Sequence, residues 1–568
     1  MRTMRKLGIG YQDFEQLRKN NNFYVDKTKF ICDWWANGDA VTLITRPRRF
    51  GKTLMMSTVE AFFSVKYTNR RDLFEGLQVW EDNDMRKLQG TYPVLSISFA
   101  DMKENTYIQA RKKICRILKE LYNRYHFLLE GDLLTESEKR DFQHISIDME
   151  DNEASYSLKA LSNYLFRYYD KKVIILLDEY DTPMQEAYIN GYWEELASFT
   201  RSLFNSTFKT NPYMERAIMT GITRVSKESI FSDLNNLEVV TTTSEKYAES
   251  LGFTQEEVFA VLDEFQLSDR KQEVKQWYDG FTFGNQTDIY NPWSILNYLD
   301  KKQFGTYWAN SSSNGLVGKL IREGSKELKV SFESLLQGES ITIEIDEQIV
   351  YDQLNQDEQA IWSLLLASGY LKVKHFKAYL SDFGEWKQEY ELQLTNFEVR
   401  TMFRTMVKKW FVSAVSVYND FVKALLLGDV DAMNDYMNHV AEITFSSFDT
   451  GKKLSKSEPE RFYHGFVLGL IVDLAGRYVL TSNRESGFGR YDVMLEPLYP
   501  NRDDGIILEF KVFQPKKEKD LEDTVKVALK QIDEKMYEAS LIAKGIEKER
   551  IRKYGFAFNG KEVLIGSS

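Results

Sequence analysis

AVTLITRPRRFGKTLMMSTVEAFF, residues 40–63, starts with an apolar run, passes through a basic turn and continues as a helical segment. Gly51, Lys52 and Thr53 stand where the turn opens into the helix. Backbone N–H groups at a helix N-terminus attract phosphate oxygens, a lysine there can reach the β- and γ-phosphates, and a threonine hydroxyl can bind Mg²⁺. The pattern therefore predicts a phosphate-binding loop that follows a buried strand.

The loop departs from the usual pattern G-x-x-x-x-G-K-[ST] at its first position, where this chain has Arg46. Arg46, Arg48 and Arg49 add positive charge that can contact phosphate or acidic neighbours. Taken alone, the tripeptide is also compatible with a solvated basic turn. A second motif further along the chain favours the phosphate-binding interpretation.

That second motif is KKVIILLDEYD, residues 171–181, a buried-strand pattern that ends in Asp178 and Glu179. An acidic residue at this position can hold Mg²⁺ through water, and a following glutamate can orient or deprotonate the attacking water. A helix cap or strand-end turn is the alternative for this pair, and Asp181 is a weaker acidic candidate. We assign nucleotide binding to Arg49, Phe50, Gly51, Lys52, Thr53 and Asp178, Mg²⁺ to Thr53 and Asp178, and catalysis to Glu179.

Four strand candidates, residues 40–45, 93–100, 171–181 and 216–225, alternate with helical segments. This alternation predicts parallel β-α-β units and a sheet that is covered on both faces. At the end of the fourth candidate, Thr220, Thr223 or Arg224 can sense a γ-phosphate, although a polar residue at a strand end is often structural. We expect the ATPase domain to span residues 1–250.

The rest of the chain divides by pattern into three further regions. Residues 251–412 predict mixed helices, with a helix-strand-strand-helix unit from about residue 345 that would suit a winged helix. Residues 413–455 predict a helical connector, and residues 456–568 an α/β domain with β-hairpin patterning. We interpret the run Trp277 to Phe281 as a turn that aromatic packing holds in place.

The C-terminal region carries a cluster of charged residues in GRYDVMLEPLYPNRDDGIILEFKV, residues 489–512. Glu509 and Lys511 lie two apart on one strand and project from the same face, and Asp492 on the preceding strand can join them after hairpin pairing. Asp492 and Glu509 can share Mg²⁺ that polarises a phosphodiester, while Lys511 positions the nucleophile or stabilises developing charge. An ion pair on a half-exposed strand is the alternative interpretation.

Composition limits the classes of protein that are possible. The chain has 568 residues, a net charge of −11 and only two cysteines, Cys32 and Cys115. A nucleic-acid site must therefore be a local basic surface, and neither a disulfide framework nor a zinc site is expected. No signal peptide and no apolar run of membrane-spanning length is visible, so we expect a cytoplasmic protein without a membrane partner.

Five segments carry a resemblance to a known family: YVDKT (24–28), RPRRFGKT (46–53), LLDEYDTP (176–183), TGITRVSKESIFSDLNNL (220–237) and WYDGFTFG with IYNPWS (277–294). The chain resembles the AAA-ATPase-like family of bacterial proteins, whose members commonly end in a domain of the PD-(D/E)XK nuclease superfamily. The resemblance implies an α/β fold: an additional-strand catalytic-glutamate P-loop sheet, then a C-terminal restriction-endonuclease-like domain.

The resemblance also implies roles for particular residues. Lys52 and Thr53 correspond to the Walker A motif, and Asp178 and Glu179 to Walker B. Gln531, with Tyr537 on the same helix, resembles the Gln that lies near the active site of exonuclease-type members, and we assign it to the catalytic set. Many such nucleases carry a Glu on the first helix, where this chain has His464 with Glu460 one turn earlier.

Two classes of function remain open. In the first, ATP binding and hydrolysis drive a Mg²⁺-dependent phosphodiesterase that acts on DNA or RNA. In the second, the chain is a nucleotide-controlled switch whose C-terminal domain binds nucleic acid or a partner without cutting. Nucleotide binding without turnover is a third possibility, because Arg46 can reshape the loop. ATPase modules of this kind often form rings or dimers, which leaves a homo-oligomer open, and no arginine finger can be assigned.

Overall fold

The computed structural model describes residues 5–224, 231, 234–311, 315–345, 354, 357–410, 415–448, 458–482, 485–486, 489–490 and 492–568. The chain divides into two compact units, Met1–Ser312 with Thr342–Val399, and Ser313–Ile341 with Arg400–Ser568. The predicted nucleotide site lies in the first unit and the predicted phosphodiesterase site in the second. No helix in the described ranges combines the length and the apolar character needed to cross a bilayer.

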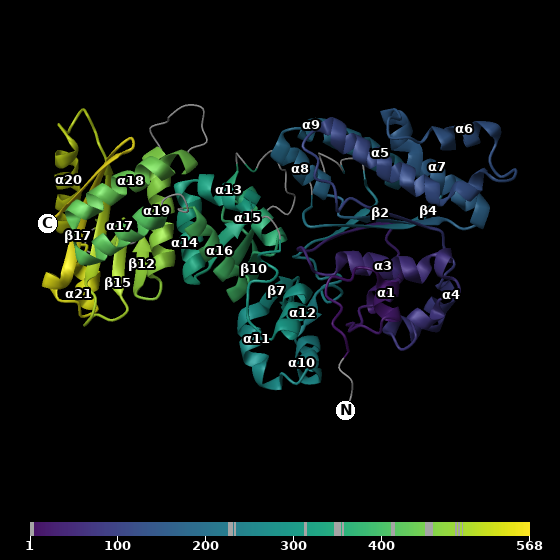
Figure 1. Cartoon of the computed structure of the whole chain (residues 1–568), viewed down its shortest axis with the longest axis horizontal. Helices are drawn as coiled ribbons and strands as arrows, with labels where there is room; N and C mark the ends of the chain where they lie inside the picture. The colour runs from purple at the N-terminus through teal and green to yellow at the C-terminus, as the bar shows by residue number, and fades with distance from the viewer. Residues whose placement is uncertain are drawn as a thin grey trace. The chain divides into compact units, whose positions relative to one another are not determined.

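A five-stranded parallel sheet forms the core of the first unit (Figure 1). Its strands are β1 (Val41–Thr45), β2 (Val94–Ser98), β3 (Val173–Asp178), β4 (Met214–Gly221) and β5 (Leu237–Val240), in the order β2-β3-β4-β1-β5. β4 therefore lies between the strand that precedes the basic turn and the strand that ends in Asp178. This inserted strand is the defining feature of the additional-strand P-loop fold, so the predicted fold class is confirmed.

Helices cover both faces of this sheet, with α1, α3 and α4 on one face and α5, α7, α8 and α9 on the other (Figure 1). The helices are α1 (Phe14–Lys19), α2 (Lys29–Asn37), α3 (Lys52–Phe63), α4 (Asn83–Leu88), α5 (Tyr107–Arg124), α6 (Glu136–His144), α7 (Asp151–Tyr169), α8 (Thr182–Asn190) and α9 (Trp193–Phe204). On the α3 face, Trp34, Phe62 and Phe63 pack against Ile174 and Ile218 of the sheet. Burial of these apolar side chains stabilises the sheet that carries the site.

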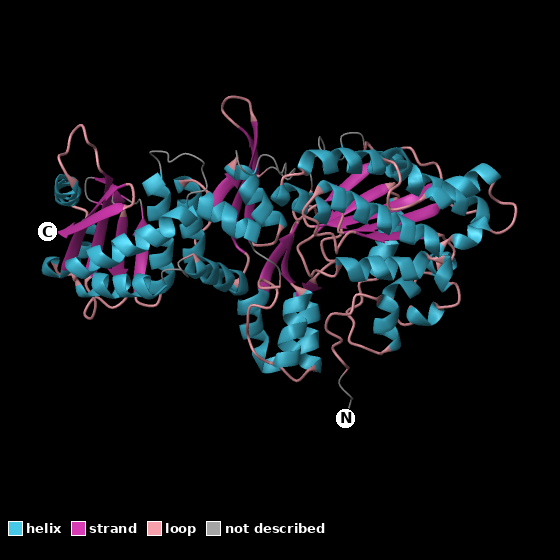
Figure 2. Ribbon diagram, turned by 45° about the horizontal axis from the view of Figure 1, so that its top comes forward, coloured by secondary structure: helices cyan, strands magenta, loops and turns pink. Residues whose placement is uncertain are grey.

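The first unit also contains two small sheets (Figure 2). β6 (Phe253–Thr254), β8 (Gln286–Tyr290) and β7 (Asp279–Phe283) form one, beside helices α10 (Gln255–Glu264), α11 (Lys271–Tyr278) and α12 (Pro292–Lys301). β10 (Leu371–Leu380), β11 (Trp386–Leu394) and β9 (Ile341–Glu344) form the other. In sequence, β10 and β11 follow α15 (Glu358–Ala367) and precede α16 (Phe397–Lys409), most of which belongs to the second unit. The expected helix-strand-strand-helix order is present in residues 358–409.

The second unit is built on a mixed sheet in the order β12-β15-β16-β17-β18. Its strands are β12 (Tyr478–Ser482), β15 (Val493–Pro497), β16 (Gly505–Val512), β17 (Ile551–Asn559) and β18 (Glu562–Ser567), with a separate short pair β13 (Glu485–Ser486) and β14 (Gly489–Arg490). The helices are α13 (Gly315–Glu323), α14 (Lys326–Gln337), α17 (Val415–Leu427), α18 (Val430–Phe448), α19 (Glu458–Leu474), α20 (Leu521–Glu534) and α21 (Ala539–Ala543). β15 and β16 pair as the predicted hairpin.

Two asparagines of α18 cover the edge strand of this sheet. Asn438 donates to the Val563 carbonyl at 2.7 Å and accepts from the Val563 N–H at 2.8 Å. Asn434 does the same for Ile565, at 2.8 and 2.7 Å. The two side chains lie one helical turn apart, so together they take the place of a neighbouring strand.

We expect the double variant Asn434→Ala, Asn438→Ala to lower the free energy of unfolding of the second unit by roughly 2–4 kcal/mol, because four backbone groups lose their partners. Urea unfolding combined with hydrogen exchange of the Val563 and Ile565 amides measures the effect. Asn501→Ala, at an exposed turn of the same unit, is the control. Unchanged protection of the two amides in the double variant would contradict this role.

Candidate functional sites

The loop between β1 and α3 has the backbone shape of an anion-binding nest. Arg49 has φ 65° and Gly51 has φ 88°, both left-handed, and Gly51 is the N-cap residue of α3. Alternating left- and right-handed residues turn successive N–H groups toward one concavity, and the N-terminus of α3 adds its positive end to the same place. The geometry therefore suits a phosphate group.

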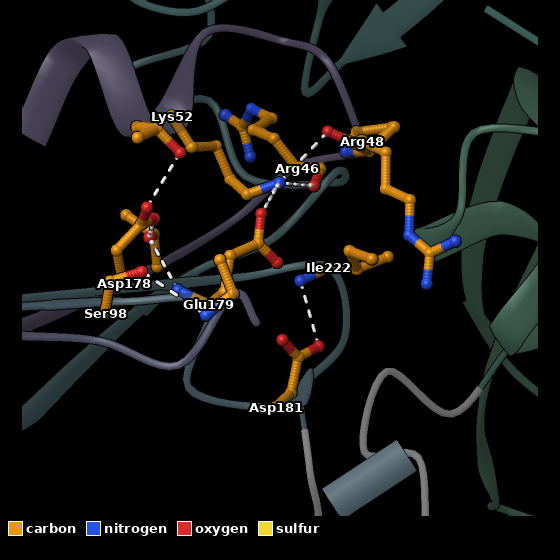
Figure 3. Close-up of polar contacts among 12 residues, drawn as sticks. Arg46, Arg48, Lys52, Ser98, Asp178, Glu179, Asp181 and Ile222 are labelled. Atoms are coloured by element: carbon orange, nitrogen blue, oxygen red, sulfur yellow. Dashed lines mark hydrogen bonds and ion pairs between the residues drawn. The ribbon is translucent and has the colours of Figure 1, made fainter. Parts of the chain in front are cut away.

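Lys52 points into this loop and is almost completely buried, with 3% of its surface exposed. Its ammonium group donates to the carbonyl oxygens of Arg46 at 3.1 Å and Pro47 at 3.2 Å, and lies 3.4 Å from Oε1 of Glu179 (Figure 3). The ammonium group is held by two neutral carbonyl oxygens and one carboxylate. A phosphate in this loop would be a stronger partner than the carbonyls, because it is charged.

Asp178 connects the ends of β3, β4 and α3 through two hydroxyl groups. Thr53 donates to Oδ2 of Asp178 at 2.7 Å, and Thr220, at the end of β4, donates to Oδ1. Burial raises the pKa of Asp178, and the Glu179 charge raises it further. A carboxylate and a threonine hydroxyl in contact are the oxygen ligands that Mg²⁺ uses beside nucleotide phosphates, so these residues fit the ion.

Glu179 follows Asp178 in a left-handed conformation, with φ 54°. This strained backbone turns the side chain toward Lys52, and the Glu179 N–H donates to Thr220 Oγ1 at 3.4 Å. Residues held in such conformations gather at functional sites, where surrounding contacts keep them in place. Its partial exposure leaves room for a water molecule beside the carboxylate.

Asp181 and Thr223 form the turn after β4 rather than the centre of the site. Oδ2 of Asp181 accepts from the N–H groups of Ile222 at 2.9 Å and Thr223 at 2.8 Å, and from the Thr223 hydroxyl at 2.8 Å (Figure 3). Asp181 thus fixes the segment that carries Arg224, which is partly exposed. The polar residues at the end of the fourth strand therefore have different partners: Thr220 contacts Asp178, and Thr223 contacts Asp181.

The arginines of the loop have three different environments. Arg46, which we expected to contact phosphate or acidic neighbours, is fully buried and donates to carbonyl oxygens of Thr45 at 2.9 Å and Thr241 at 2.6 Å. Burial lowers its pKa to about 9. Its guanidinium stacks on Phe283, with 4.3 Å to the ring centroid, so the residue in place of the first glycine points away from the nest. Arg48 donates to Gln185 at 3.2 Å, and Arg49 is exposed.

We expect Thr220→Val to lower the free energy of unfolding of the first unit by about 1–3 kcal/mol, because the buried Asp178 carboxylate loses a hydrogen bond. The matched control is Thr200→Val on α9, because the Thr200 hydroxyl is buried and has no partner in the described part of the structure. That variant should stay within about 0.5 kcal/mol of wild type. Thermal and urea unfolding compare the two, and equal losses would contradict the role of Thr220.

The predicted residues of the C-terminal site come together in the second unit. Val493 pairs with Leu508 across the β15–β16 hairpin, so Asp492, one residue before β15, lies opposite Glu509. Oδ2 of Asp492 accepts from the Phe510 N–H at 2.8 Å, which holds its carboxylate beside the strand that carries Glu509. The two carboxylates therefore meet as hairpin pairing predicts.

Glu509 is buried, with 1% of its surface exposed, and the side chains of Lys511 and Gln531 both contact its Oε1. Lys511 donates to this oxygen at 2.8 Å, and Gln531 of α20 donates to it as well as to the Tyr537 hydroxyl at 2.9 Å. Burial, and then the charge of Asp492, raises the pKa of Glu509 to about 7.

Oε2 of Glu509 is buried and has no partner among the described residues. Two opposed carboxylates with one free oxygen provide the oxygen donors with which Mg²⁺ is commonly bound, so the residues fit a divalent cation. In the described part of the chain no third His, Cys, Asp or Glu joins them. The side chains of Glu460 and His464 lie outside the described residues.

The residues that sequence reasoning missed lie on the outer side of the nucleotide loop. Phe281 and Phe283 of the run around WYDGF pack on Phe50, and Asn291 and Trp293 of IYNPWS contact the backbone of Arg48 and the side chain of Arg49. The only local signal was Asn-Pro, which is typical of a helix N-cap followed by proline.

Comparison with known proteins agrees with this geometry. Residues 8–231 match the family model described as "Predicted AAA-ATPase", and residues 458–568 match the model of the PD-(D/E)XK nuclease superfamily. A protein of Azotobacter chroococcum mcd 1, "Uncharacterized protein in vnfD 5'region", is 28% identical over 323 residues. That alignment covers 56% of this chain and 57% of the relative, so the chain spans little more than half the length of the curated protein it matches.

The first unit has the sheet order of an additional-strand P-loop fold, and the second unit has a mixed sheet consistent with a nuclease-like domain. Residues 8–231 therefore match the AAA-ATPase-like family model, and the C-terminal residues 458–568 match that of the PD-(D/E)XK nuclease superfamily. The family resemblance in the sequence is therefore confirmed.

Proposed function

We propose that the first unit binds and hydrolyses ATP with Mg²⁺. The observation that carries this proposal is the meeting of two motifs more than 120 residues apart in sequence. Thr53 is bonded to Asp178 at 2.7 Å, and Lys52 lies 3.4 Å from Glu179, at the mouth of an anion-binding loop. A lysine, a hydroxyl and two carboxylates around such a loop are the groups that phosphoryl transfer from a nucleotide requires.

Each residue has a separate task in this proposal. The N–H groups from Arg49 to Thr53 hold the phosphates, and Lys52 exchanges its carbonyl partners for phosphate oxygens. Thr53 and Asp178 would hold Mg²⁺, which neutralises charge on the phosphates when it is bound. Glu179 orients the attacking water and accepts its proton, and Thr220 keeps the Asp178 carboxylate turned toward Thr53.

We further propose that the second unit is a Mg²⁺-dependent phosphodiesterase that acts on nucleic acid. Asp492 and Glu509 would hold the cation, which lowers the pKa of bound water when it is present. Gln531 and Lys511 fix the orientation of the Glu509 carboxylate through Oε1, which leaves Oε2 for the ion. Lys511 is partly exposed and can orient the nucleophile or stabilise charge on the phosphate. The nucleotide state of the first unit is proposed to control this activity.

A second candidate is a nucleotide-controlled switch whose C-terminal domain binds nucleic acid or a protein without cutting. The net charge of −11 favours it, since a nuclease must attract a polyanion. Under this alternative, nucleotide changes partner affinity or protease sensitivity, and no cleavage product forms. A homo-oligomer is compatible with both candidates.

For the ATPase, we expect Glu179→Gln to keep nucleotide binding and to lower kcat by roughly 100-fold or more, since proton transfer and water orientation are lost. Lys52→Ala should weaken binding itself. Release of inorganic phosphate and equilibrium titration with a fluorescent ATP analogue measure the two effects. Lys87→Ala, an exposed lysine paired with Asp84, is the control. Wild-type protein that binds without turnover would replace the ATPase by a nucleotide sensor, and absence of binding would remove the proposal.

For the phosphodiesterase, we expect Mg²⁺-dependent cleavage of DNA or RNA that falls by at least about 100-fold in Glu509→Ala and in Lys511→Ala. Single-stranded, double-stranded, linear and circular substrates should be tested with and without ATP, and with Mg²⁺ replaced by a chelator. Lys544→Ala, whose lysine pairs with Glu496 in the same unit, should cleave like wild type. Equal cleavage by all four proteins would exclude this site, and binding without cleavage would favour the switch.

A further inference from the structure

The outer side of the nucleotide loop is covered by a segment that lies outside residues 8–231, the range that matches the ATPase family model. Phe50 packs edge-on against Phe281 and Phe283, with ring centroids 4.7 and 5.4 Å apart. Both phenylalanines belong to β7, some 230 residues after the loop in sequence. The loop is therefore shaped by two parts of the chain that are far apart in sequence.

Asn291 makes a side-chain hydrogen bond between these parts. Its side chain is buried, with 1% exposed, and its amide nitrogen donates to the carbonyl oxygen of Arg48 at 3.2 Å. Its amide oxygen caps α12, accepting from the N–H groups of Trp293 at 2.9 Å and Ser294 at 3.4 Å. One side chain thus uses its acceptor to begin a helix and its donor to hold the loop.

Arg49 shows why the loop needs such support. A non-glycine residue with φ 65° carries local strain, which persists only where surrounding contacts maintain it. The Arg49 guanidinium stacks on Trp293, 4.5 Å from the ring centroid, two residues beyond Asn291. The residue before Arg49 is the one whose carbonyl Asn291 holds, so both contacts act on the same peptide.

Two glycines show that the packing around the loop is close. A Cβ atom at Gly369 would lie 2.6 Å from Cγ of Pro47, and one at Gly252 would lie 2.9 Å from Cε1 of Phe50. Gly252 also donates its N–H to the Phe50 carbonyl at 3.3 Å. Pro47 and Phe50 are therefore closely packed, and the hydrogen bond from Asn291 reaches Arg48, which lies between them in sequence.

We infer that Asn291 is a positioning residue of the nucleotide site: its hydrogen bond to the Arg48 carbonyl, together with stacking of Arg49 on Trp293, keeps the loop in the left-handed conformation that turns its N–H groups toward phosphate. This inference rests on the proposed nucleotide binding. The loop contacts phosphate in the ground state and in the transition state alike, so its distortion weakens binding and leaves the chemical step nearly unchanged.

Asn291→Ser separates positioning from capping, because serine caps a helix as well as asparagine does but is too short to reach the Arg48 carbonyl. We expect the Kd for a fluorescent ATP analogue with Mg²⁺, and the KM for ATP, to rise roughly three- to tenfold, the equivalent of one hydrogen bond. The kcat should stay within about twofold. Trp293→Leu should raise the Kd in the same direction while keeping the asparagine cap.

The control is Thr135→Ala on the full-length chain, which removes the capping-box threonine of α6, on the opposite face of the sheet from α3 (Figure 1). It should lower the melting temperature with no change in Kd. A Kd of Asn291→Ser equal to that of wild type, with wild type binding nucleotide, would overturn the role of Asn291 and leave the proposed ATP site intact. A wild-type chain that binds no nucleotide would overturn both.

Discussion

The buried carboxylate of Asp178 is the constraint on which the first unit depends. Its two oxygens are bonded to hydroxyls from two different elements, Thr53 on α3 and Thr220 on β4. A buried charge is costly unless each oxygen is satisfied, so these partners must stay in register. The parallel order β3-β4-β1 delivers them, because it brings the carboxyl ends of the three strands to one edge of the sheet.

The strained residues around this carboxylate follow from the same geometry. Arg49 and Glu179 both have left-handed backbones, and both flank the place where phosphate would lie. Strain of this kind, about 1–3 kcal/mol for each residue, has to be offset by contacts elsewhere. Glu179 is held by Lys52 and Thr220, both from the sheet domain, whereas Arg49 is held by Trp293. The two strained residues on either side of the proposed phosphate position are therefore supported by different regions of the sequence.

The C-terminal site reaches a related result through antiparallel pairing. Asp492 precedes β15 and Glu509 lies near the end of β16. Antiparallel pairing of the two strands therefore places these residues opposite each other, although they are 17 residues apart in sequence. The strand around Glu509 is buried on both sides, which places the carboxylate in a low-dielectric environment and raises its pKa. Lys511 and Gln531 satisfy one oxygen only. Here the sheet concentrates negative charge that a cation would neutralise.

The strands and the charged residues that end them could be predicted from the sequence, whereas some of the residues that hydrogen-bond to these charges could not. VIILLD and GIILEFK each show an apolar run that ends in charge, so the strands, Asp178 and Glu509 were predictable from local pattern alone. β5, with only four residues and a partly exposed pattern, gave no such signal. Hairpin pairing was equally local, which is why Asp492 could be placed opposite Glu509.

Some of the residues that contact Asp178 and the loop between β1 and α3 were harder to predict, because the order of the strands, and not the local sequence pattern, brings them together. Thr220 was one of three candidates at the end of its strand, and only the position of β4 between β1 and β3 shows why it is the one that contacts Asp178. Arg46 was expected to contact phosphate or acidic neighbours, yet it is buried against nearby carbonyl oxygens and the ring of Phe283. Asn291 lies more than 240 residues from Arg48, and only the packing of β7 and β8 beside the loop joins them. A charge that ends a buried strand can be recognised from its own neighbours, whereas the groups that satisfy it belong to other elements and follow only from the fold.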